Sequence, residues 1–112
     1  MEPVQPKIVF QFGNVSLDTS TRECKVNNEV ITLTPTEFDL LAYLAHHPNQ
    51  VFSRSKLLEA TDLGAYEGVE RTVDVHIHNL RKKIEEDPAN PKFILTVFGV
   101  GYRFVNQIGN AG

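Results

Sequence analysis

The fold is decided by one stretch of the chain, RTVDVHIHNLRKK at residues 71–83. Its apolar residues recur at helical spacing, because Val73, Ile77, Leu80 and Ile84 fall at i, i+4, i+7 and i+11. At about 100° per residue, this spacing places them on a single face of a helix. We therefore predict an amphipathic helix over about residues 70–86 that docks on a core through this stripe.

The face opposite the stripe is cationic and rich in hydrogen-bond donors. It carries Arg71, Val75, His78, Asn79 and Lys82, with Thr72, His76, Arg81 and Lys83 on its flanks. Such a mixture suits the phosphates, base edges and thymine methyl groups of a DNA major groove. The alternative is an ordinary solvated helix, since amphipathic patterns are common on protein surfaces.

A β-hairpin is predicted directly after this helix. Pro88 stops the helix, and the β-branched and aromatic residues 92–97 indicate a strand. The turn Phe-Gly-Val-Gly at residues 98–101 leads into a second strand at residues 102–105. We expect Gly99 and Gly101 to supply the positive φ angles of a tight hairpin tip. The turn lacks the GxGxxG pattern and the Lys-Ser/Thr pair of phosphate-binding loops.

The first half of the chain predicts an antiparallel sheet followed by two helices. Alternating apolar residues and short turns indicate strands near residues 8–12, 15–17, 24–26 and 30–33. Thr34, Pro35 and Glu37 together predict a helix start with a capping box. The buried stripe of that helix is expected at Phe38, Leu40, Leu41, Ala42, Leu44 and Ala45. After a short apolar extension at residues 51–52, Ser53 caps a second helix that runs to about residue 60.

Composition limits the chain to one domain with a single modest core, since it has 112 residues. It contains no apolar run of membrane-spanning length and no secretory start, so we expect a cytoplasmic protein. The single cysteine, Cys24, excludes an internal disulfide and is expected to be a small inward-facing strand residue. The net charge is −3, yet residues 71–112 carry six Lys and Arg against four Asp and Glu. A local basic face matters more than the total for phosphate contacts.

The order of helix, helix, outward-facing helix and hairpin predicts a winged helix-turn-helix. Over roughly residues 7–106, the chain resembles the DNA-binding effector domain of OmpR/PhoB-type response regulators. The motifs that carry the resemblance are LTPTEFDLL at 33–41, RSKLL at 54–58, RTVDVHI at 71–77, LRKK at 80–83 and GVGYRF at 99–104. We expect an α+β fold with an N-terminal four-stranded antiparallel sheet, three helices and a C-terminal β-hairpin wing. Residues 1–6 are interpreted as an interdomain linker remnant and residues 107–112 as a flexible tail.

The resemblance also implies partners. It implies binding to double-stranded DNA at tandem direct repeats, regulation of transcription, and a phosphorylatable receiver domain N-terminal to this one. It assigns the loop at residues 61–70 to contact with RNA polymerase, through Asp62, Tyr66 and Glu67. No cofactor and no membrane are implied.

The resemblance assigns individual contacts on the recognition helix, residues 70–86. Arg71, Thr72 and Arg81 fall where the family contacts phosphates, and Lys82 suits the same role by charge. Val75 falls where an apolar side chain meets a thymine methyl. His78 and Asn79 occupy positions where relatives place arginines, and Asn79 predicts a preference for adenine.

The wing departs from the pattern of the family. Phe98 lies where many relatives carry an arginine that enters the minor groove, so the wing is expected to contribute less affinity. Thr96 can donate to a phosphate. Arg103 is expected to support the wing or to contact the DNA backbone.

Enzymatic interpretations are not favoured by the spacing of the polar residues. His76 and His78 lie about 200° apart on a helix and cannot share a metal ion. A triad of Ser53, Asp74 and His76 fails for a similar reason, and Asp74 is expected to pair with Arg71 or His78. Residues 85–87, Glu-Glu-Asp, are interpreted as a solvated helix end that points away from DNA. The competing function is a winged helix used for protein–protein contacts, which would explain the acidic total and the missing wing arginine.

Overall fold

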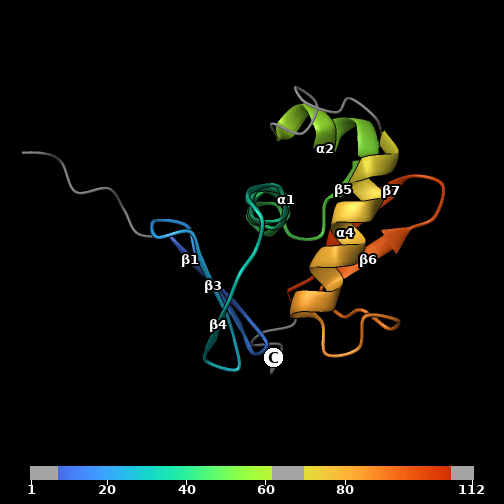
Figure 1. Ribbon diagram of the computed structural model, residues 1–112. Helices are drawn as coiled ribbons and strands as arrows, with labels where there is room; N and C mark the ends of the chain where they lie inside the picture. The colour runs from blue at the N-terminus through green and yellow to red at the C-terminus, as the bar shows by residue number, and fades with distance from the viewer. Residues whose placement is uncertain (1–7, 62–69, 107–112) are drawn as a thin grey trace, which may run out of the picture.

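The computed structural model describes residues 8–61 and 70–106. Its elements are β1 (Val9–Phe12), β2 (Val15–Asp18), β3 (Glu23–Val26), β4 (Glu29–Ile31), α1 (Pro35–His46), β5 (Val51–Ser53), α2 (Arg54–Ala60), α4 (Glu70–Ile84), β6 (Ile94–Val97) and β7 (Gly101–Phe104) (Figure 1). The expected linker at residues 1–6, the expected tail and the loop with Asp62, Tyr66 and Glu67 lie outside the described residues. No helix among those described is long and apolar enough to cross a membrane.

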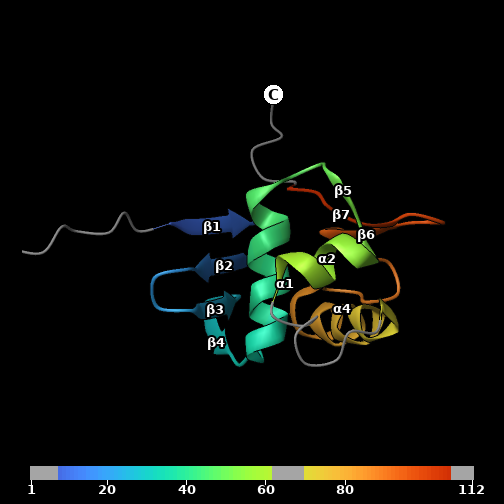
Figure 2. The ribbon, with the colours of Figure 1, turned by 90° about the horizontal axis from the view of Figure 1, so that it is seen from above.

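The N-terminal sheet is an antiparallel meander in the order β1-β2-β3-β4, as its alternating pattern predicts. It lies on one side of α1, while α2, α4 and the second sheet lie on the other (Figure 2). Phe12, Val15, Leu17 and Cys24 are buried in the core. Burial raises the pKa of the Cys24 thiol to about 11, so this cysteine stays protonated at neutral pH and acts as a small apolar residue.

The start of α1 has the predicted capping box. The Thr34 hydroxyl accepts a hydrogen bond from the Glu37 backbone N–H at 3.1 Å, and the Glu37 carboxylate accepts one from the Thr34 N–H at 3.0 Å. Pro35 occupies the first turn, where its missing N–H leaves no bond unmade. The predicted stripe is confirmed at Phe38, Leu40, Leu41, Leu44 and Ala45, which are buried, whereas Ala42 is half-buried.

The apolar stripe of α4 lies in the core as predicted. Val73, Ile77, Leu80 and Ile84 are each at most 1% exposed, and α4 packs against both α1 and α2. The helix ends at Ile84, two residues before the predicted end, and the next residue, Glu85, is buried. One face of α4 is therefore fixed against the core, and the opposite face points outward.

The second sheet is larger than the predicted hairpin. Residues 51–52, expected only as a short apolar extension before the Ser53 cap, form β5 together with Ser53, and β5 pairs with β7 to give the order β5-β7-β6. Gly101 allows the close approach of β7 to β5, because a Cβ atom at this position would lie 1.9 Å from the backbone oxygen of Phe52. The prediction of a positive φ angle is correct for Gly99, at +80°, but wrong for Gly101, which belongs to the strand.

Candidate nucleic-acid interface

The outward face of α4 gathers the residues that the sequence assigns to DNA. Arg71, Val75, His78 and Lys82 are exposed, and Asn79 is half-buried beside them. Val75 is 53% exposed, an unusual position for a valine on a helix whose other faces are packed or charged. Thr72 and His76 lie half-buried on the flank of the same face. The arrangement places one apolar side chain among cations and hydrogen-bond donors, a combination that suits contacts with phosphates, base edges and a thymine methyl.

Arg81 faces the wing. Its Nε and Nη2 atoms donate to the Ile94 backbone oxygen at 3.0 and 2.7 Å, and Nη2 also donates to the Thr96 hydroxyl at 2.9 Å. Its guanidinium lies 5.5 Å from the centre of the Tyr102 ring. Burial lowers the pKa of Arg81, and the neighbouring Tyr102 and Glu85 oppose that shift. Arg81 and Thr96, both expected at phosphates, therefore contact one another and brace α4 against β6.

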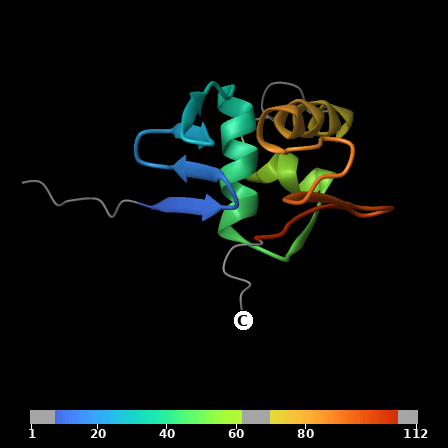
Figure 3. The same cartoon turned by 90° about the horizontal axis from the view of Figure 1, so that it is seen from below.

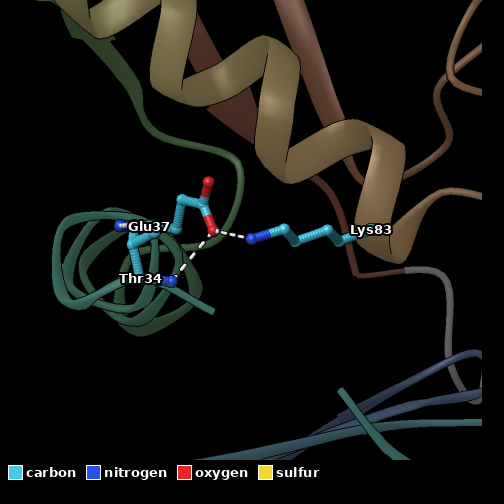
Figure 4. A network of polar contacts seen from close by, with 3 residues as sticks. All are labelled: Thr34, Glu37 and Lys83. Carbon is cyan, nitrogen blue, oxygen red and sulfur yellow. Dashed lines mark hydrogen bonds and ion pairs between the residues drawn. The ribbon is translucent and has the colours of Figure 1, made fainter. Parts of the chain in front are cut away.

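Lys83 also points into the molecule. Its Nζ lies 2.6 Å from the carboxylate of Glu37, the same group that completes the capping box with Thr34 (Figure 4). The Glu37 side chain is almost completely buried, so the ammonium group supplies the charge that such a carboxylate needs. This contact ties the last turn of α4 to the first turn of α1. Of the three basic residues in the last turn of α4, Lys82 is the exposed one.

The prediction for Asp74 was wrong, because its partners come from other elements. One carboxylate oxygen accepts from Arg54 Nη1 at 3.0 Å, and the other accepts from the Tyr102 hydroxyl. Burial first, and then this hydrogen bond, raise the pKa of Tyr102 to about 12. Asp74 therefore joins α4 to α2 and β7 instead of neutralising Arg71 or His78 on its own helix. Local spacing could not reveal partners that lie 20 and 28 residues away in the chain.

Glu85 was also interpreted incorrectly, since it is not solvated. The side chain is 7% exposed and its carboxylate accepts hydrogen bonds from the backbone N–H groups of Lys92, Phe93 and Ile94, at 2.7, 3.0 and 2.9 Å. A carboxylate that satisfies three consecutive donors fixes the entry of the chain into β6. Glu86 and Asp87 are exposed, as expected for a helix end.

The tip of the wing is apolar and open to solvent. Phe98 is 90% exposed, and Val100 is exposed beside it. The turn is closed by a 2.9 Å bond from the Val100 N–H to the Val97 oxygen. A shallow groove separates the tip from Arg54 and Asp74. Arg103 lies half-buried in β7, and its Nε is buried with no hydrogen-bond partner among the described residues.

The two histidines of α1 and its C-terminal cap, and the serine of the candidate triad, have structural contacts. His46 and His47 lie against aromatic rings of Phe10, Tyr43 and Phe52. The Ser53 hydroxyl caps α2 by accepting the Lys56 N–H at 3.0 Å. Over the part of the chain that the structure describes, no group of three or more His, Cys, Asp or Glu residues could hold a metal ion.

Residues 27–104 match the family model described as "Transcriptional regulatory protein, C terminal". The chain belongs to this family. It is also similar to part of a longer protein. It is 43% identical over 99 residues to the DNA-binding response regulator MtrA of Mycolicibacterium smegmatis. The aligned region covers 88% of this chain and 43% of MtrA. The chain thus spans less than half the length of that relative.

Solved structures of the family share the fold. The response regulator DrrB of Thermotoga maritima, an OmpR/PhoB homologue, superposes with a TM-score of 0.79 at 35% identity, covering 88% of this chain and 44% of DrrB. The RstA DNA-binding domain of Klebsiella pneumoniae, solved with the RstA box, gives 0.73 at 35% identity and covers 87% and 96% of the two chains. These comparisons confirm the α+β winged-helix fold and the OmpR/PhoB-type resemblance.

Proposed function

We propose that this chain binds double-stranded DNA sequence-specifically, as the effector domain of a two-component response regulator that controls transcription. The outward face of α4 carries the proposal. Its stripe from Val73 to Ile84 is fixed in the core, so Arg71, Val75 and Lys82 are held outward together. Related domains solved with DNA, those of RstA and AdeR, support the same use of the fold.

The geometry refines the proposed role of each residue. Arg71 and Lys82 are the cations open to phosphates, with Thr72 and His76 on the flank. Arg81 commits Nε and Nη2 to the wing, which leaves its Nη1 group for a phosphate. We assign base reading to Val75, His78 and Asn79, with the valine against a thymine methyl and the asparagine on adenine.

The wing is assigned to the DNA backbone or the minor groove. Thr96 lies in β6, where Arg81 already holds its hydroxyl, so its contribution to phosphate binding is positional. Arg103 lies half-buried in β7, the central strand of this sheet, and is assigned to supporting the wing or to a contact with the DNA backbone.

Further features of the full-length protein are proposed from the family. They are a receiver domain N-terminal to this one, operators built from tandem direct repeats, a contact with RNA polymerase through residues 61–70, and a cytoplasmic location. A repeat spacing near one helical turn would place successive domains on the same side of the duplex.

A second function has one specific observation in its favour. Phe98 is exposed at the wing tip and the chain is acidic overall, a combination that also suits a protein partner. A module of that kind would show no salt-dependent affinity for duplex DNA. It would also keep its partner when Lys82 is replaced by Ala.

Selection of bound duplexes from a randomised pool, at two salt concentrations, tests the proposal. Sequence-specific binding predicts a short motif repeated in tandem, with affinity that falls as salt rises. Asn79→Arg should then shift the selected base from adenine toward guanine at one position and leave the others unchanged. Recovery of no motif, with binding that disappears at the higher salt, would contradict the proposal and favour the protein-contact function.

A further inference from the structure

Phe98 is the most exposed large apolar side chain of the described residues, and the fold does not require it. The turn is closed by backbone atoms of Val97 and Val100, and Gly99 supplies the positive φ angle. The hydrophobic core contains no atom of Phe98, whose side chain is 90% exposed. Phe98 and the exposed Val100 together make the tip an apolar surface that is open to a ligand.

The hairpin carries this ring to the DNA-facing side of the molecule. The β6–β7 hairpin projects beyond α2 and α4, away from the N-terminal sheet (Figure 3). The groove beside the tip is bounded by Asp74 of α4 and Arg54 of α2. A duplex whose major groove holds the outer face of α4 therefore has its backbone, and the adjacent minor groove, next to the hairpin.

The charge of the tip excludes a purely electrostatic contact. Residues 97–100 are Val-Phe-Gly-Val and carry no cation. The cation beside the groove, Arg54, is bonded to Asp74 at 3.0 Å. What the tip offers is an aromatic ring and two valines, which fit the sugars and stacked bases of a minor groove. Apolar side chains placed there act as wedges that partly unstack a base step and kink the duplex.

We propose that Phe98 is an apolar wedge that enters the minor groove beside the α4 site and selects a deformable pyrimidine–purine step. This inference rests on the proposed DNA-binding function and adds a second readout to it. The outer face of α4 contacts base edges, and the wing discriminates between base steps by the energy needed to unstack them. TA and CA/TG steps cost least to open, so the wing prefers them without a hydrogen bond to any base.

The test compares four forms of the 112-residue chain on one duplex. They are the unaltered chain, Phe98→Ala, Phe98→Arg and the control Val30→Ala, which removes another exposed apolar side chain, 61% exposed, from β4 of the N-terminal sheet. The probe is the duplex recovered by the selection above, with 2-aminopurine placed in turn at each adenine beside the motif. Unstacking raises its fluorescence.

For the unaltered chain and for Val30→Ala, we expect increased 2-aminopurine fluorescence at one base step next to the DNA motif that α4 selects. Phe98→Ala should keep the motif, lose the fluorescence change and the step preference, and bind about tenfold more weakly. Phe98→Arg should instead prefer narrow A-tracts, with a salt slope steeper by about 0.9 for the added phosphate contact. Phe98 is exposed, so neither change should alter folding.

Three results would overturn the inference. If the unaltered chain recovers a motif but Phe98→Ala matches it in affinity, step preference and fluorescence, the wedge is wrong while DNA binding stands. If Phe98→Ala converts a dimer to a monomer without DNA and leaves the base step unaffected, the tip contacts a second copy of the chain. If no form recovers a motif, the proposed function fails, and the wedge fails with it.

Discussion

The basic residues of α4 differ sharply in what they contact. Arg81 and Lys83 turn inward, one to the wing at Ile94 and the other to Glu37 of α1. Arg71 and Lys82 remain exposed on the outer face. A basic helix in a sequence is therefore not equivalent to a basic surface, because some cations hold the helix at a fixed position so that the others can face a ligand.

The same contrast divides the wing into a base and a tip. The base, meaning the strands β6 and β7, is fixed in three ways: by the Glu85 carboxylate on consecutive backbone donors, by the Arg81 guanidinium, and by the close approach of Gly101 to β5. The tip, with Phe98, makes none of these contacts. A rigid base with an open tip holds one apolar contact at a constant distance from the outer face of α4.

Gly101→Ala should give the largest effect. The new Cβ would lie 1.9 Å from the Phe52 oxygen, a backbone atom that cannot move without breaking the β5–β7 pairing. We expect a loss of about 4 kcal/mol in the free energy of unfolding, measured by urea denaturation. Gly99→Ala is the matched control at the tip, where no atom lies within 4 Å and only the positive φ angle costs about 1 kcal/mol. Equal losses would show that base and tip are equally constrained.

Glu85→Ala should be the next most damaging change. It leaves the backbone donors of Lys92, Phe93 and Ile94 without their acceptor, at a cost of about 3 kcal/mol. Glu86→Ala removes the neighbouring carboxylate from an exposed position and should stay within about 0.5 kcal/mol. Thermal unfolding of both variants measures the difference. A tolerated Glu85→Ala would mean that water replaces the carboxylate.

Replacing two adjacent lysines, one inward-facing and one outward-facing, separates a role in stability from a role in DNA binding. Lys83→Met should lower stability by about 1–2 kcal/mol, because it leaves the buried Glu37 carboxylate without its cation. Lys82→Met should leave stability unchanged and weaken DNA binding, with a salt slope shallower by about 0.9. Urea denaturation and salt-dependent binding are measured on both variants. The two-role description would be rejected if both lysines affected the same property.

The effect that is absent at neutral pH is a pH dependence at Tyr102. Burial and the hydrogen bond to Asp74 raise its pKa to about 12, from the ordinary value of 10.0. Since the folded chain binds this proton more tightly, the associated stability is complete below about pH 10 and is lost as pH rises toward 12. Asp74→Asn should lower the Tyr102 pKa. The titration is measured by tyrosinate absorbance against pH, and the Tyr102→Phe variant supplies the background from the other tyrosines. An unchanged midpoint would show that burial alone sets the value.

Local patterns in the sequence predicted much of this fold. Thr34 and Glu37 are three residues apart, and the apolar stripe of α4 repeats every three or four, so both signals lie within a few turns of one helix. The outer face of α4 followed from the same periodicity. Its individual DNA contacts remain predictions.

The features that were missed depend on residues far apart in the chain. Asp74 finds Arg54 and Tyr102, Lys83 finds Glu37, and Glu85 bonds to the strand that follows the next loop. A carboxylate has the same appearance in a sequence whether it ends in water or against buried N–H groups. For β5, the β-branched and aromatic pair Val51-Phe52 was a usable signal, but three residues are too few to indicate a partner strand.

The pairing of β5 with β7 also has a consequence for synthesis on the ribosome. Strands β1 to β4 pair only with their neighbours in sequence, so that sheet can close while the rest of the chain is still being translated. β5 is made before α2 and α4, yet its partner emerges only at residues 101–103. Until then the nascent chain carries an unpaired strand edge of the kind that chaperones shield. The half of the domain that carries α4 and the wing is thus completed last.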